Sequence, residues 1–125
     1  MWNSKEFGIS SNNYWKEKHH IVFRGQGGLD LEYNLIELDA DFHKGKDGPH
    51  LNRQTDLKLK RKLQEKYFSL FSKEKYALEE ILIIAKPMNN KSKDKLEKRL
   101  LKEANYLGEY ERERIVRVLM GGRLY

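Results

Sequence analysis

Residues 18–50 read KHHIVFRGQGGLDLEYNLIELDADFHKGKDGPH, and this stretch decides the fold. Two short apolar runs, residues 20–23 and 35–38, stand on either side of a glycine-rich segment at residues 25–28. Two apolar runs separated by a turn-forming segment are typical of two neighbouring strands joined by a turn. The sequence therefore predicts a β-hairpin.

A short helix is expected directly after the second strand. Asp39 or Asp41 can begin it, because aspartate caps the exposed N–H groups of a first helical turn. The glycines and the proline within residues 45–49 stop it after about a turn or two. His50 is therefore expected on a loop.

The composition changes near residue 52, where long charged residues replace the glycine-rich pattern. Apolar residues at three- and four-residue steps predict three or four helices. The predicted helices begin near Thr55, Ser72, Ser92 and after Gly108, and Gly121 and Gly122 end the last one. We expect an α+β fold with a core at residues 1–52 and a helical extension at residues 53–125, packed as one domain.

The composition favours some classes of partner and excludes some kinds of site. Lys and Arg exceed Asp and Glu by 25 to 19, a formal net charge of +6, which favours a polyanionic partner. The absence of cysteine excludes disulfides, a thiolate nucleophile and a Cys-liganded zinc. No apolar run has transmembrane length and residues 1–18 lack a signal-peptide core, so we expect a soluble, intracellular protein with no membrane partner.

The four histidines all lie within 32 residues, from His19 to His50. His19 and His20 are adjacent, so on a strand their side chains point to opposite faces. One can hold a metal while the other faces a substrate. Further imidazole ligands can come only from His43 and His50.

The same residues resemble the HNH nuclease signature. The resemblance covers residues 18–50, about a quarter of the chain, and rests on paired histidines, an Asn fourteen residues after the second, and a His nine residues after that Asn. The matching positions are His19-His20-Ile21, Arg24, Gly27-Gly28, Asp30, Asn34-Leu35, Leu38 and His43. The Gly-Pro-His ending and the Lys-rich segment after it resemble short HNH proteins of phages and prophages, which implies the cytoplasm of a bacterial or phage-infected cell.

The resemblance implies a ββα-metal finger, in which the hairpin and short helix clamp one divalent ion. His19 and His43 would be metal ligands, and His20 would be the general base that takes a proton from the attacking water. Asn34 would hold the hairpin and orient His20, and Arg24 would contact a phosphate. The implied reaction is hydrolysis of DNA phosphodiester bonds to 3′-hydroxyl and 5′-phosphate ends, with the ion stabilising the phosphate and the leaving oxygen.

The sequence departs from the family at the ligands. The Cys pairs of many members are missing, and with them the separate structural zinc. The third ligand is either His50, which we favour because residues 48–49 can fold a loop back over the ion, or Asp47. The ion itself stays open among Mg²⁺, Mn²⁺, Ni²⁺ and Zn²⁺.

A basic helix follows the expected site. Its cations could track a DNA backbone, or they could form a solvated face; they are Lys58, Lys60, Arg61, Lys62 and Lys66, of which we favour Lys58, Arg61 and Lys62. The alternative function is an inactive HNH-derived module that binds nucleic acid or protein, as a phage regulator or inhibitor. A third hypothesis is a structural metal site in a helical interaction module. A homodimer is compatible with the sequence, which does not require one.

Overall fold

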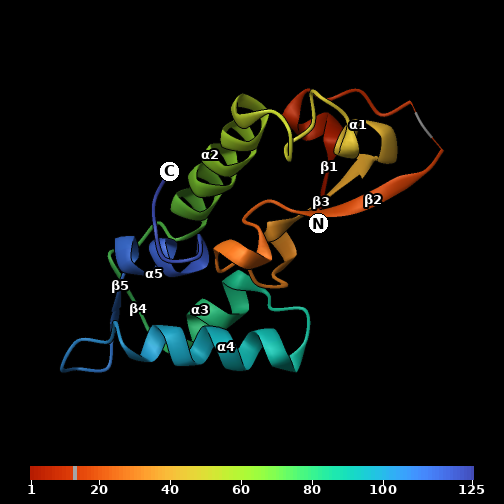
Figure 1. Ribbon diagram of the computed structural model, residues 1–125. Coiled ribbons are helices and arrows are strands. Elements are labelled where there is room, and N and C mark those ends of the chain that lie inside the picture. The colour runs from red at the N-terminus through yellow and green to blue at the C-terminus, as the bar shows by residue number, and fades with distance from the viewer. Residues whose placement is uncertain (13) are drawn as a thin grey trace.

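The computed structural model describes residues 1–12 and 14–125 (Figure 1). The fold is α+β, as predicted, with small sheets and helices. The strands are β1 (Trp2–Asn3), β2 (Lys16–His20), β3 (Leu35–Asp39), β4 (Lys75–Tyr76) and β5 (Tyr110–Glu111). The helices are α1 (Ala40–Lys44), α2 (Arg53–Leu70), α3 (Leu78–Ala85), α4 (Asn90–Leu101) and α5 (Arg112–Leu119), with single 3-10 turns at Ser4–Phe7, Arg24–Gln26 and Glu32–Asn34.

Strand β3 lies in the middle of the first sheet. It pairs with β1 in parallel and with β2 in antiparallel register, which sets His19 opposite Ile36 and His20 opposite Leu35. The second predicted strand is therefore confirmed. Strand β1, which brings the N-terminus against β3, was not predicted, because two residues give no readable alternation.

The first predicted strand, residues 20–23, is wrong, because β2 ends at His20. The Val22 amide donates to the Asn34 side chain at 2.8 Å rather than to a neighbouring strand. The chain turns back here so closely that a Cβ on Gly28 would lie 1.8 Å from the Val22 carbonyl oxygen. The apolar residues at 21 and 22 are buried in this turn rather than in a strand.

Helix α1 confirms the short helix predicted after the hairpin. Its five residues follow Asp39, and Gly45 ends it. A Cβ on Gly48 would lie 2.1 Å from the Phe42 carbonyl oxygen, so the chain can fold back over α1 only with glycine there. His50 follows on a turn, as expected.

Three helix starts differ from the prediction. Helix α2 begins at Arg53, two residues before Thr55, because the Asn52 side chain accepts from the Thr55 amide at 3.1 Å. The segment near Ser72 does not begin a helix, because β4 pairs there with β5, more than thirty residues along the chain, and α3 begins only at Leu78. Helix α4 begins at Asn90, two residues before Ser92, since the Asn89 side chain accepts from the Ser92 amide at 2.8 Å. Gly121 and Gly122 follow α5 with φ of 88° and 108°, which confirms the predicted stop.

The sheet and the helices share one buried cluster, which includes Leu38 of β3, Leu63 of α2, Leu96 of α4 and Ile115 of α5. Figure 1 shows the segment between β2 and β3 lying against α3 and α4. The Asp30 amide there donates to Ser92 Oγ of α4 at 3.0 Å. In the described part of the chain, no helix combines the length and the apolar character needed to cross a membrane.

Candidate metal centre

Three imidazoles converge where β2 ends. His19 comes from β2, His43 from α1 and His50 from the turn before α2. His43 Nε2 lies 3.2 Å from His19 Nδ1 and 2.9 Å from His50 Nε2. These three residues form a group in which the candidate ligand atoms lie within 4.8 Å of one another. The convergence joins residues that are up to 31 positions apart in sequence.

Hydrogen bonding alone does not satisfy this arrangement. A single ring nitrogen carries either one proton or one lone pair, so His43 Nε2 can bond well to only one of its two neighbours. Nitrogens bound tetrahedrally at about 2.1 Å from one ion stand roughly 3.4 Å apart. This is close to the 3.2 Å and 2.9 Å that separate His43 Nε2 from the other two rings. A divalent cation would use a lone pair from each ring at once, so these residues fit a metal ion.

The electrostatic environment favours the neutral forms of His19 and His50, and the neutral imidazole is the form that binds metal. Burial, reinforced by the neighbouring His43 and His50, lowers the pKa of His19 from 6.5 to about 3. Burial also lowers the pKa of His50. In the described part of the chain His19 Nε2 is buried without a hydrogen-bond partner, so no protein acceptor favours protonation of this ring.

Glu17 orients the second of these rings. Its Oε1 lies 3.0 Å from His43 Nδ1, and the hydrogen bond from His43 is the main reason why the pKa of Glu17 is lowered. An ionised carboxylate only accepts, so His43 Nδ1 carries the proton and Nε2 presents its lone pair to the centre. A carboxylate behind a histidine is the usual outer partner of a metal ligand.

The centre is closed on one side and open on the other. His19 is buried, His43 half-buried and His50 exposed. The His50 ring stacks on Phe23, with centroids 5.0 Å apart, so this apolar side chain positions the exposed ring. An ion held by these three rings would keep its accessible side free for water or substrate, as in catalytic sites. Asp47, the alternative third ligand, stands outside this group of residues.

His20 points away from the three imidazoles into a different environment. Its Nε2 lies 2.7 Å from Asp30 Oδ1, and Arg24 Nε lies 3.5 Å from the same nitrogen. Asn89, the cap of α4, donates to the other carboxylate oxygen of Asp30 at 3.0 Å. The hydrogen bond from His20 is the first cause of the lowered pKa of Asp30. The expected separation of the two adjacent histidines is therefore present.

Asn34 ties the loop between β2 and β3. It is fully buried, accepts from the Val22 amide at 2.8 Å and donates to the carbonyls of Val22 at 3.2 Å and Leu29 at 3.0 Å. Its expected part in holding the hairpin agrees with these bonds. The His20 ring, in contrast, is held by Asp30 rather than by Asn34.

The cations expected to form one basic face on α2 lie in two different environments. Lys60 is not exposed: it is fully buried, pairs with Asp56 at 2.6 Å and lies 4.0 Å above the Phe23 ring. The expectation that Lys60 is exposed is wrong, because Lys60 borders the buried positions Leu59 and Leu63 on the helix. The other expected DNA contacts, Lys58, Arg61 and Lys62, line a shared groove with Glu65, and Lys62 donates to the Glu6 carbonyl of the N-terminal segment.

Sequence reasoning missed Glu17 and Asn89 as parts of the site. Glu17 stands two residues before His19, and alternation along a strand puts both on one face, so this signal was readable. Asn89 meets Asp30 across 59 residues, and no local pattern signals that contact.

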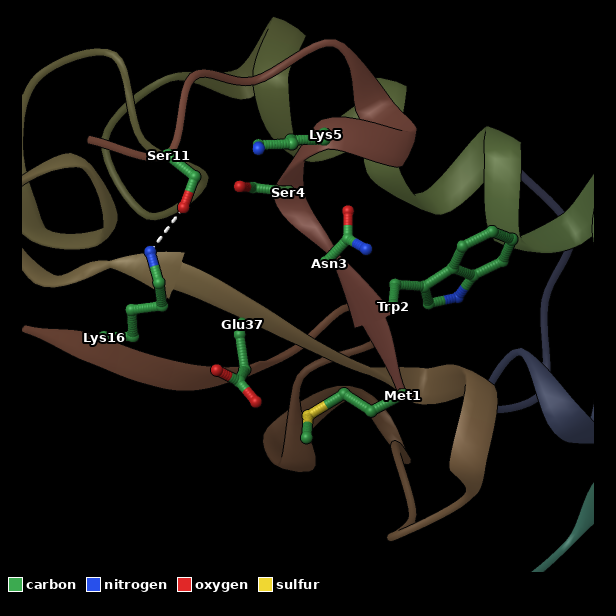
Figure 2. Close-up of a pocket in the computed structure, with 8 residues that line it drawn as sticks. All are labelled: Met1, Trp2, Asn3, Ser4, Lys5, Ser11, Lys16 and Glu37. Atoms are coloured by element: carbon green, nitrogen blue, oxygen red, sulfur yellow. Dashed lines mark hydrogen bonds between the residues drawn. The ribbon is translucent and has the colours of Figure 1, made fainter. Parts of the chain in front are cut away.

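A separate hollow of about 290 Å³ lies beside β1 (Figure 2). Figure 2 shows Lys16, which donates to Ser11, and Glu37 at its edge. Its lining contains no histidine, and so it is unrelated to the metal centre.

Comparison with family models, curated proteins and solved structures found no match to this chain. The case for function therefore rests on the site itself.

Proposed function

We propose that this protein is a metal-dependent endonuclease of the HNH type that hydrolyses DNA phosphodiester bonds. The observation that carries the proposal is the division at the end of β2: His19 joins two further imidazoles, and the adjacent His20 faces a carboxylate and an arginine. A metal ligand and a general base on neighbouring residues suit phosphodiester hydrolysis, which needs both functions within a few ångströms of one phosphorus.

The order of elements supports the HNH assignment. Antiparallel strands β2 and β3 are followed directly by α1, and His19 and His43 lie on the first strand and on that helix. Asn34 binds the loop between the strands at the position expected from the signature. The third ligand would be His50, which the turn after Gly48 carries to the other two rings.

His19, His43 and His50 would hold one divalent ion. When bound, the ion supplies Lewis-acid stabilisation of the phosphate charge and of the departing 3′ oxygen. An all-imidazole set suits Zn²⁺, Ni²⁺ or Mn²⁺ better than Mg²⁺, which prefers oxygen ligands. Glu17 would keep the His43 ring in its ligating tautomer.

His20 would act as the general base. Asp30 accepts from Nε2, which keeps the proton on that nitrogen and leaves Nδ1 with the lone pair. Nδ1 would take a proton from water as the water oxygen bonds to phosphorus and the bond from phosphorus to the 3′ oxygen breaks. The products are a 5′-phosphate and a 3′-oxyanion that solvent protonates. Arg24 beside His20 would bind a non-bridging phosphate oxygen.

The test is cleavage of supercoiled plasmid by metal-stripped protein, with Mg²⁺, Mn²⁺, Ni²⁺ or Zn²⁺ restored one at a time and metal without protein as the control. Calorimetry on the same samples measures binding of each ion. We expect cutting only with protein and metal together. Metal binding without any cutting would leave a binding module or a structural metal site, and failure to bind any ion would remove the metal centre itself.

A further inference from the structure

A polar hollow of about 210 Å³ adjoins the His20 site on the side of α4. Its cations are Arg24 from the loop after β2 and Lys91, Lys95 and Arg99 from α4. The three α4 residues are spaced four apart, so they share one face of the helix. Cations from two separate segments therefore gather in one place.

The acidic group in this hollow is already engaged. Asp30 accepts from His20 at 2.7 Å and from Asn89 at 3.0 Å, and Arg24 Nη2 lies 3.6 Å away. Its charge is thus shared among His20, Arg24 and Asn89, the cap of α4. It leaves the positive charge of the α4 face largely uncompensated.

The α4 cations have no carboxylate of their own. Within residues 1–12 and 14–125, no ion pair involves Lys91, Lys95 or Arg99. Arg99 donates to the Gly27 carbonyl at 2.5 Å, which fixes the guanidinium against the loop without neutralising it. Lys91 and Lys95 are exposed. Together these groups present concentrated positive charge to an incoming anion.

Arg24 and Asp30 belong both to the hollow and to the surroundings of His20, so a strand cut at His20 would pass directly into it. The face from Lys91 to Lys95 to Arg99 is about 12 Å long at 1.5 Å per residue, room for about three successive phosphates of one DNA strand.

We propose that Arg24 and the α4 face of Lys91, Lys95 and Arg99 bind the phosphate backbone of DNA next to the bond that is cut. This inference rests on the proposed nuclease function and assigns its main DNA contact to α4. The face of α2 with Lys58, Arg61 and Lys62 is then secondary, because Glu65 lines the same groove and Lys62 already bonds to the N-terminal segment.

The experiment measures binding of a fluorescein-labelled 20-base-pair DNA duplex to full-length, metal-loaded His20→Ala protein, in which cutting should not interfere. Lys91→Gln/Lys95→Gln is compared with the matched control Lys58→Gln/Lys62→Gln, which removes the same charge. We expect roughly a tenfold or greater loss of affinity near 100 mM salt for the α4 variant, and a decrease of about two in the slope of log affinity against log salt. The α2 variant should change affinity by less than about threefold.

Lys91→Arg/Lys95→Arg keeps the charge and should retain binding, which separates charge from folding; thermal melts check each variant. Equal losses in both glutamine variants, or a loss confined to the α2 variant, would overturn the proposal. So would unchanged DNA binding in the α4 variant, including the case in which the hollow binds only an acidic peptide such as polyglutamate.

Plasmid cutting by the wild-type protein is measured separately. Cutting without an effect of the α4 variant on DNA binding would contradict this surface alone. An effect of the α4 variant without any cutting would contradict the nuclease function and leave a DNA-binding face.

Discussion

His19 and His20 are consecutive residues in opposite environments. His19 is buried, with its pKa lowered to about 3, among two other imidazoles. His20 is partly exposed and pairs with Asp30 beside a basic hollow. Successive side chains of a strand point to opposite faces, so two adjacent residues can supply a metal ligand and a base without a large pocket. Mutations on the His19 side and on the His20 side should therefore impair different functions.

The largest effect should come from the His19 side. His43→Ala removes the ring that contacts both other imidazoles, so calorimetry should detect little metal binding. Loss of the ion removes several kcal/mol of transition-state stabilisation, so plasmid cleavage should decrease on the order of a thousandfold. Normal metal affinity in this variant would contradict the ligand set.

Glu17→Gln should have a smaller effect on the same side. The amide keeps the shape but removes the negative charge behind His43, and we expect about a tenfold loss of metal affinity. Glu37→Gln, on β3 at the edge of the N-terminal hollow, changes the net charge equally and should leave the affinity unchanged. Equal losses in both variants would mean that only overall charge matters.

Much of the separation between the His19 side and the His20 side could be predicted from the sequence. The resemblance that rests on His19, His20, Asn34 and His43 implied that His19 and His43 meet, and Gly48-Pro49 indicated how His50 returns. Contacts that join distant segments could not be predicted: Asn89 with Asp30, β4 with β5, and β1 with β3. Lys60 was misjudged because its burial depends on Asp56 and Phe23 as partners, not on its own polarity.

The smallest effect is on stability and pH. The unfolded chain protonates His19 near pH 6.5 but the folded chain only near pH 3, so the unfolded state binds more protons between these values. The metal-free protein should therefore lose stability as the pH falls below 6.5, by about 1.4 kcal/mol per pH unit at most. Urea unfolding in chelator at pH 7 and pH 5 measures this. His19→Leu should flatten the dependence, and an equally steep dependence in that variant would assign it to other groups.

The division between the two sides is tested most directly by His20→Ala at matched metal occupancy. Wild type and variant are loaded to the same bound-metal content, verified by elemental analysis, and plasmid cleavage is measured under single-turnover conditions. We predict equal metal affinity and a cleavage rate lower by about 10² to 10⁴ in the variant, the usual contribution of a general base. Cleavage at the wild-type rate would contradict the role of His20, and loss of the metal in His20→Ala would contradict the separation of the two sides.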